Sequence, residues 1–217
     1  MSLSMSVFSL DAAGAGATSL HQALASAQRR IAALSEANAE LRQRLQAQSA
    51  EMKRAWTQAA YDELTGLPNR RLLADRLRQT LARAERQRQG FSLLLIDVNG
   101  FKGINDTLGH AAGDRLLCAI GERLSACVRA NDTVCRYGGD EFVVLLPEVE
   151  STAALAAVRA KIGACMAQPV ALAGRALTVT LAVGAARYPG HGAGIDALLA
   201  AADRAMYRDK KAGRQAG

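Results

Sequence analysis

Residues 20–56 contain neither proline nor glycine, and their apolar residues recur every seven positions. The two apolar positions of this heptad hold Leu20, Leu24, Ala27, Ile31, Leu34, Leu41, Leu45, Met52 and Ala55, with polar Asn38 and Gln48 completing the series. Such a repeat is typical of a coiled coil. At ~1.5 Å per residue it predicts a single helix of roughly 55 Å.

The polar residues of this helix bear on how many strands the coiled coil has. Asn38 falls at position a, where a lone asparagine favours two parallel strands in register. The neighbouring e and g positions are not charge-matched, since they hold Arg30, Ser35, Arg42, Arg44 and Ser49. A long helix packed back on its own domain is the alternative. Five heptads favour a parallel homodimer through residues 20–56, with room for a regulatory protein on the coiled coil.

The segment before this helix is small and featureless. It holds Ala12, Ala13, Gly14, Ala15, Gly16 and Ala17. We expect residues 1–18 to be disordered, residues 19–58 to form the dimerising helix and residues 59–217 to form the catalytic domain. The first residues lack the basic region and long apolar core of a signal peptide. The sequence contains no run of about 18 apolar residues, so we predict no membrane span.

Composition narrows the class of protein. Four scattered cysteines, without a Cys-x-x-Cys pair, predict neither a disulfide framework nor a zinc site and suit the reducing cytoplasm. The net charge of +7 fits a polyanionic partner, an arginine-rich helical surface or a site for a phosphorylated nucleotide. A nucleic-acid binder is the least favoured reading, because no base-reading or stacking motif is present.

The order of predicted elements after residue 70 indicates the fold. Asn69 can cap a helix, and residues 91–98 form a continuous apolar run typical of a strand buried on both faces. Further helices are expected at residues 103–108, 114–128, 153–167 and 198–211, and a strand at 178–186. Together with the hairpin described next, this order predicts an α+β (α/β) domain with a ferredoxin-like βαββαβ core.

A pair of glycines joins two short β-rich runs, residues 133–135 and 142–146. Gly138 and Gly139 between them predict a hairpin, because tight primed turns need positive φ. Asp140 and Glu141 follow at once, so two carboxylates sit beside a turn without side chains. This leaves room for a metal-bound triphosphate, although an exposed solubilising turn is the plainer reading of this stretch alone.

Polar residues elsewhere suggest a nucleotide site. Asp97 stands near the end of the buried strand, where a carboxylate is costly unless it is paired or binds a metal. The loop after it leads into a helix N-terminus, where amides and Lys102 favour phosphate. Asn105 and Asp106 could read a guanine edge, or could simply end one helix. No Walker-type loop is present.

These motifs together resemble the GGDEF family of bacterial diguanylate cyclases, over about residues 61–214. The opening motif is Asp62-x-Leu64-Thr65-Gly66-Leu67-Pro68-Asn69-Arg70. The central motifs are Asp97-x-Asn99-x-Phe101-Lys102, Asn105-Asp106, Gly109-His110 and Gly113-Asp114. The signature is Gly138-Gly139-Asp140-Glu141-Phe142, and the closing motif is Tyr207-x-x-Lys210-x-x-Gly213-Arg214.

The resemblance implies a nucleotidyl-cyclase type of fold and the condensation of two GTP into cyclic di-GMP and pyrophosphate. Asp97, the Val98 carbonyl and Asp140 would hold two Mg²⁺ ions, or Mn²⁺. Asp140 would also activate the attacking hydroxyl, supported by Glu141 and Lys102. The residues implied in substrate binding are Phe101, Asn105, His110, Asp114, Gly138, Gly139, Lys210 and Arg214. Those implied in inhibition by the product are Arg129 and Asp132.

The chain departs from the family pattern at two positions. Asn99 stands where the family commonly has a second aspartate, and Gln215 replaces the usual closing asparagine. The alternative to an active cyclase is a catalytically silent member that senses cyclic di-GMP through Arg129 and Asp132. The intact signature argues against it. A coiled-coil scaffold that docks a partner protein is compatible with catalysis.

Overall fold

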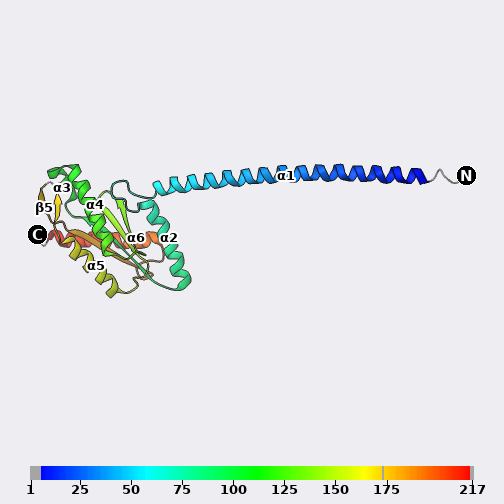
Figure 1. Ribbon diagram of the computed structural model, residues 1–217. Helices are drawn as coiled ribbons and strands as arrows, with labels where there is room; N and C mark the ends of the chain where they lie inside the picture. The colour runs from blue at the N-terminus through cyan, green and yellow to red at the C-terminus, as the bar shows by residue number, and fades with distance from the viewer. Residues whose placement is uncertain (1–5, 173, 216–217) are drawn as a thin grey trace. The chain divides into compact units, whose positions relative to one another are not determined.

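The structure is a computed structural model that describes residues 6–172 and 174–215, with the side chains of residues 6–19, 58 and 213–215 outside the description. The chain separates into two compact units, Met1–Trp56 and Thr57–Gly217. Figure 1 shows the elements of each. Within the described residues, no helix is both long enough and apolar enough to cross a lipid bilayer.

Helix α1 runs from Ser6 to Gln58 and accounts for nearly all of the first unit. The apolar heptad residues from Leu20 to Met52 are exposed, with 58–72 % of their surface accessible. The disorder expected for residues 1–18 is not seen from Ser6 onward, while residues 1–5 lie outside the description. Alanine explains the difference, because its helix propensity outweighs the cost of Gly14 and Gly16.

The second unit is built on a four-stranded antiparallel sheet in the order β2-β3-β1-β6. Its strands are β1 (Phe91–Val98), β2 (Thr133–Gly138), β3 (Glu141–Leu146) and β6 (Leu181–Tyr188). This order confirms the predicted βαββαβ core of the ferredoxin-like kind. The two central strands, β1 and β3, are therefore the ones whose ends carry Asp97 and the signature residues.

Helices cover both faces of this sheet (Figure 1). On one face lie α4 (His110–Cys127) and α5 (Thr152–Met166), with α3 (Phe101–Leu108) at their edge. On the other lie α2 (Arg70–Gln87) and α6 (Ile195–Gln215). Successive residues of β1 alternate between the two cores, which is why the whole strand is buried. Asp97 shares the α2/α6 face with Leu93 and Leu95.

Helix α6 approaches the sheet closely because of one glycine. A Cβ atom on Gly184 of β6 would collide with the backbone of Ala202 and Met206. Leu198, Ala202 and Met206 are accordingly buried against the sheet. This close packing lets the later turns of α6 reach the end of β1.

Side chains and a turn form hydrogen bonds with the outward-facing backbone groups of β6. The Val183 N–H donates to Asp209 Oδ2 at 2.8 Å, and its carbonyl accepts from Arg159 at 3.1 Å. Four residues on, the Arg187 N–H donates to His191 Nδ1 at 2.9 Å, and its carbonyl accepts the His191 N–H at 2.8 Å.

Several boundaries differ from expectation. Helix α3 begins at Phe101 rather than residue 103, and α6 runs from Ile195 to Gln215 rather than over residues 198–211. A hairpin of β4 (Val170–Leu172) and β5 (Arg175–Leu177) was not predicted. Strands of three residues are too short to show a period, and only Gly174, with φ of 77°, marks their turn.

Candidate active site

The end of β1 meets the signature turn. Asp97 and Glu141 are directly paired across β1 and β3, so their side chains share one face of the sheet. The Val98 N–H donates to the Asp140 carbonyl at 3.3 Å. The sequence predicted that these residues would converge, and the register of the two central strands brings them together.

The carboxylates of this corner repel one another. Burial raises the pKa of Glu141, and the negative charges of Asp97, Asp140 and Asp203 raise it further, while Lys210 acts in the opposite direction. Asp97 is only 8 % exposed and pairs with the Lys210 ammonium at 2.7 Å. The corner therefore holds more negative charge than its own lysine balances, and a cation would stabilise it.

Asp203 is a member of this corner that the sequence motifs did not predict. It lies on α6, seven residues before Lys210, so both side chains project from the same face of the helix. This two-turn spacing was the signal that could have found it. Asp203 adds charge without being part of any motif.

The donor atoms of the corner fit a hard divalent cation. They are carboxylate oxygens and the Val98 carbonyl, which are the ligands that Mg²⁺ and Mn²⁺ accept in proteins. Among the residues that the structure describes, no group of three or more His, Cys, Asp or Glu side chains is gathered around a cation position. The predicted ligand set differs from such a group, because it has only two carboxylates and its third ligand is a backbone carbonyl.

A network of hydrogen bonds holds the signature turn. The Arg136 guanidinium donates to the Gly139 carbonyl at 2.9 and 3.0 Å and to both oxygens of Asp62 at 3.1 and 3.2 Å. Asp62 also accepts the N–H and the hydroxyl of Thr65, at 2.9 and 2.7 Å. The opening motif and the signature turn are thus one hydrogen-bonded structure.

The charge state of Asp62 suits this role. Burial by itself would raise the pKa of Asp62, but the hydrogen bonds from Thr65 and the charge and hydrogen bond of Arg136 hold it below the usual value. The ionised carboxylate therefore keeps Arg136 in place near neutral pH. No sequence pattern indicated this pair, because its members lie 74 positions apart.

The signature glycines act by leaving space. Neither Gly138 nor Gly139 has φ in the left-handed region, so the predicted primed turn is wrong. A bulge between Arg136 and Gly138 shapes the hairpin instead. A Cβ on Gly139 would meet no atom within 4 Å, and one on Gly138 would approach only the Glu141 carboxylate, at 3.7 Å. The turn is consequently open to an incoming group.

The α3–α4 hairpin carries the residues expected to read a base. A Cβ on Gly113 would collide with the Asn105 side chain and lie 3.2 Å from the Phe101 ring, so this glycine lets the two helices close on each other. Asn105 Oδ1 is buried and has no hydrogen-bond partner. An orphaned buried acceptor costs free energy, which a ligand donor would recover.

Other predicted substrate residues have different surroundings. His110 and Asp114 are exposed and four residues apart on the first turns of α4, hence on one face. Lys102 is exposed at the start of α3. The side chain of Arg214 lies outside the described residues, so its expected role is untested. Lys210 contacts Asp97 rather than standing apart from it.

Asn99 also has a defined place. Its side-chain amide donates to the Thr180 hydroxyl at 3.1 Å, and its backbone N–H donates to the Thr180 carbonyl at 3.0 Å. These bonds tie the loop after β1 to the segment that enters β6. Asn99 thus has a positioning role that an uncharged amide serves well.

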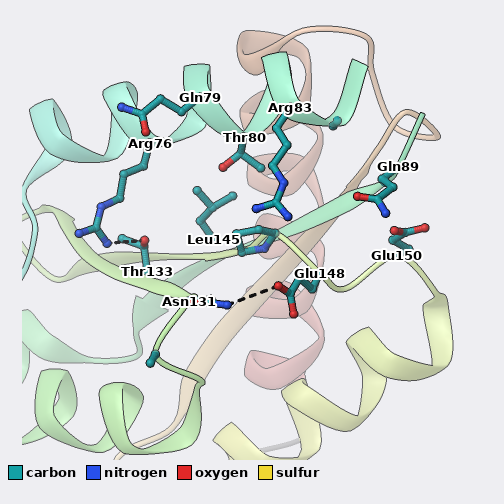
Figure 2. A pocket seen from close by; sticks show the side chains of 14 residues that line it. Arg76, Gln79, Thr80, Arg83, Gln89, Asn131, Thr133, Leu145, Glu148 and Glu150 are labelled. Atoms are coloured by element: carbon teal, nitrogen blue, oxygen red, sulfur yellow. Dashed lines mark hydrogen bonds between the residues drawn. The ribbon is translucent and has the colours of Figure 1, made fainter. Parts of the chain in front are cut away.

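The Arg129–Asp132 loop follows α4 and folds on itself. The Arg129 N–H donates to Asp132 Oδ2 at 2.8 Å. Beside this loop lies a cavity of about 540 Å³, shown in Figure 2, with Ala130 and Asn131 in its wall. Arg76 and Arg83 of α2 line the opposite side, as Figure 2 shows.

The cavity carries both signs of charge. Arg76 donates to the Thr133 hydroxyl at 2.6 Å, while Glu148 accepts from Asn131 at 3.4 Å (Figure 2). The sequence motifs predicted the loop but not the two arginines, because Arg76 and Arg83 belong to α2, far from the loop in the sequence.

Comparison with known proteins places these features in a family. The family model described as "Diguanylate cyclase, GGDEF domain" matches residues 59–216. The bifunctional diguanylate cyclase/cyclic di-GMP phosphodiesterase MucR of Pseudomonas aeruginosa is 43 % identical over 156 residues, which are 72 % of this chain and 23 % of MucR. Diguanylate cyclase TpbB is 43 % identical, over 72 % of this chain and 36 % of TpbB. The chain thus spans about a third or less of these relatives.

Two solved structures resemble the chain beyond the globular unit. Diguanylate cyclase SiaD of Pseudomonas aeruginosa, solved with its activator SiaC, is 30 % identical with a TM-score of 0.68, covering 95 % of this chain and 80 % of SiaD. The coiled coil and GGDEF domain of DgcB from Caulobacter crescentus, solved with c-di-GMP, is 26 % identical with a TM-score of 0.70. That likeness covers 84 % of this chain and 94 % of the DgcB chain.

Proposed function

The chain belongs to the GGDEF family, and we propose that it is a diguanylate cyclase that condenses two GTP molecules into cyclic di-GMP and two pyrophosphates across a homodimer. The observation that carries this proposal is the acidic corner of Asp97, Asp140 and Glu141 beside an open turn. A silent receptor would have no need to keep mutually repelling carboxylates together.

Metal binding follows from the same corner. Asp97, the Val98 carbonyl and Asp140 would hold two Mg²⁺ ions, which when bound withdraw charge from phosphate oxygens. Without a bound metal, the Lys210 ammonium neutralises Asp97 at 2.7 Å. When a metal ion takes the place of the ammonium beside Asp97, Lys210 would turn to the triphosphate. Lys102 and Arg214 would supply further positive charge there.

The reaction needs one proton transfer for each bond formed. The 3′-hydroxyl of one GTP attacks the α-phosphorus of the other, a P–O bond to pyrophosphate breaks, and Asp140 would accept the hydroxyl proton. Glu141, whose pKa burial and neighbouring charge raise, would support Asp140 in the same corner. The Asp62–Arg136 pair fixes the Gly139 carbonyl and hence the turn that presents Asp140.

The guanine would lie against the α3–α4 hairpin. The Asn105 Oδ1, which has no partner in the described structure, would accept an N–H of the base, and the Asp114 carboxylate would accept the others. His110 shares a helix face with Asp114, and the Phe101 ring packs beside Asn105 and Gly113. Gly138 and Gly139 leave room for the ribose and phosphates.

Two protomers must bring their sites together, since each holds one GTP. The exposed heptad stripe of α1, from Leu20 to Met52, would join two copies in a parallel coiled coil and raise the local concentration of sites. We also propose a regulatory partner on this helix. The likeness to SiaD supports this, since it extends over 95 % of the chain and SiaD was solved with its activator.

Product inhibition is proposed at Arg129 and Asp132. The likeness to DgcB, solved with c-di-GMP, supports product binding by this chain. Asp132 already shapes the loop through the Arg129 N–H, which leaves the Arg129 side chain exposed for an anionic ligand. GTP is a cytoplasmic substrate, so the cytoplasm is the proposed place of action.

The test is incubation of the purified chain with GTP and Mg²⁺, with the products separated by chromatography. We expect cyclic di-GMP from the wild type and at least a ~10³-fold loss in Asp140→Ala. Glu122→Ala, an exposed acid on α4 outside the corner, is the matched control and should retain activity. Wild-type protein that is dimeric, binds cyclic di-GMP and yet makes none with either metal would favour the receptor alternative.

A further inference from the structure

Helices α4 and α5 are joined at their C-terminal ends by side chains that the proposed reaction does not use. Arg123 donates to the carbonyls of Cys165 at 3.5 Å, Pro169 at 2.8 Å and Gln168. One turn later on α4, the Cys127 thiol donates to the Lys161 carbonyl at 3.9 Å. These contacts join α4 to the last turns of α5 and to the segment that follows it.

The spacing of these contacts puts two cysteines on the facing surfaces of α4 and α5. Residues 123 and 127 are four apart on α4, and residues 161 and 165 are four apart on α5, so each pair occupies one helix face. Cys127 belongs to the apolar cluster against which Cys165 packs, and the neighbouring Cys165 thiol helps to raise the pKa of Cys127. Both are free thiols in the structure.

The two thiols differ in access to solvent. Cys127 is 3 % exposed, and burial, followed by the neighbouring Cys165, raises its pKa to about 11, with Lys161 acting in the opposite direction. Cys165 is partly exposed at the surface of α5. An oxidant from solvent therefore meets Cys165 first, while Cys127 stands behind it.

We propose that Cys127 and Cys165 form a redox-active dithiol that closes into a disulfide between α4 and α5 when a hydroperoxide is present. The Cys165 thiolate attacks the peroxide, the O–O bond breaks, and a sulfenic acid forms with release of hydroxide or alkoxide. The Cys127 sulfur then attacks the Cys165 sulfur, the S–O bond breaks and water leaves. The thiols lose two electrons, and the peroxide gains them.

The other two cysteines lack such a neighbour among the described residues. The Cys118 thiol donates to the Leu64 carbonyl at 3.3 Å. Cys135 is fully buried in β2, and burial above all raises its pKa to about 12. They provide internal controls within the same chain.

The disulfide would also reach the proposed product site. Cys127 is the last residue of α4, and Arg129 follows two positions later. A covalent bond draws the last turn of α4 toward α5 and shifts the start of the Arg129–Asp132 loop away from its reduced position. This consequence rests on the proposed product inhibition. We expect oxidation to weaken cyclic di-GMP binding about 3- to 10-fold.

The first experiment treats the reduced full-length chain with stoichiometric hydrogen peroxide and measures its intact mass. We expect a loss of about 2 Da, reversed by a thiol reductant, and a cross-linked peptide that contains Cys127 and Cys165. The oxidised chain should melt on the order of 5–10 °C higher, because the bond closes a long loop. Addition of oxygen without cross-linking, or a cross-link that involves Cys118 or a second chain, would overturn the proposal.

Variants separate the steps. Cys165→Ser, at a partly exposed position, should abolish the mass loss, while Cys127→Ser should leave a Cys165 sulfenic acid that dimedone traps. The double variant Cys118→Ser/Cys135→Ala should behave as wild type. A mass loss that survives Cys165→Ser would contradict the assignment.

Calorimetric titration with cyclic di-GMP, in reduced and oxidised chain, tests the consequence separately. Absence of binding in both states would remove the product site but leave the disulfide standing on its mass. Equal binding in both states would show that the disulfide forms without reaching the loop.

Discussion

Helices α1 and α6 carry similar apolar stripes and differ in what covers them. In α6, Leu198 and Ala202 are fully buried against the sheet, where Gly184 permits close approach. In α1, Leu41 and Leu45 remain 62 % and 69 % exposed. Burial of a leucine side chain is worth about 2 kcal/mol, so leaving a whole stripe exposed forgoes a large driving force.

The contrast teaches that a period determines a helix and its apolar face, but not the partner of that face. The domain supplies the cover for α6 from its own β6 and β1. For α1, the proposed cover is a second copy of the same helix.

The largest effect should come from charging the α1 stripe. Leu41→Asp/Leu45→Asp should lower cyclic di-GMP formation about 10³-fold at micromolar chain concentration, because two sites no longer share a high local concentration. Sedimentation and a product assay would measure it. Gln43→Asp/Gln46→Asp, on other faces of the same helix, should keep both dimer and activity. If the leucine variant stays active, α1 is not what joins the sites.

Truncating one leucine in each helix sharpens the comparison. Leu198→Ala should lower the free energy of unfolding of the globular unit by about 3 kcal/mol, because it removes a fully buried side chain of α6. Leu41→Ala should leave that transition unchanged and should instead raise the dimer dissociation constant. Urea denaturation at two chain concentrations separates the two. A shift of the domain transition by Leu41→Ala would show that α1 packs on its own domain.

Filling the space under α6 tests the close approach itself. Gly184→Ala should cost about 2 kcal/mol in urea, because the new methyl group collides with the backbone of Ala202 and Met206. Gly163→Ala in α5 is the matched control, since a Cβ there meets no atom within 4 Å. It should be neutral or stabilise by up to about 1 kcal/mol. Equal losses in both would argue against tight α6 packing.

The smallest expected effect is that of Glu141 on the pH dependence of stability. The pKa of Glu141 is raised in the folded chain, so the folded state binds its proton more readily than the unfolded state. Stability attributable to Glu141 should therefore be highest below the ordinary glutamate pKa and fall as pH rises through the raised value. Glu141→Gln should flatten this slope in melting curves between pH 4 and 7, with a change below about 1 kcal/mol, because Glu141 is only partly buried and solvent screens its charge. An unaltered slope would assign the effect elsewhere.

Much of the fold followed from local pattern. Asn69 caps α2 as predicted, because its side-chain Oδ1 accepts the backbone N–H groups of Arg71 and Leu72. The apolar run of β1 is buried throughout. The strand order also agrees, because connection lengths and handedness leave few ways to pair four strands. The short β4–β5 hairpin escaped prediction because its strands carry too few residues to show alternation.

Some residues of the candidate site were also predicted from the sequence, and others were not. Asp97, Val98 and Asp140 were expected to converge, and strand register brings them together. Asp203 and the Asp62–Arg136 bond were not foreseen. The seven-residue spacing from Lys210 could have pointed to Asp203, but the Asp62–Arg136 bond joins segments 74 positions apart, which no local spacing encodes.

The hydrogen bonds along the outer edge of β6 affect whether another strand can pair with it. An exposed strand edge is a template on which another sheet can grow. Asp209, Arg159 and the His191 turn occupy the outward backbone groups of Val183 and Arg187. A second chain could extend the sheet at these positions only by displacing those hydrogen bonds.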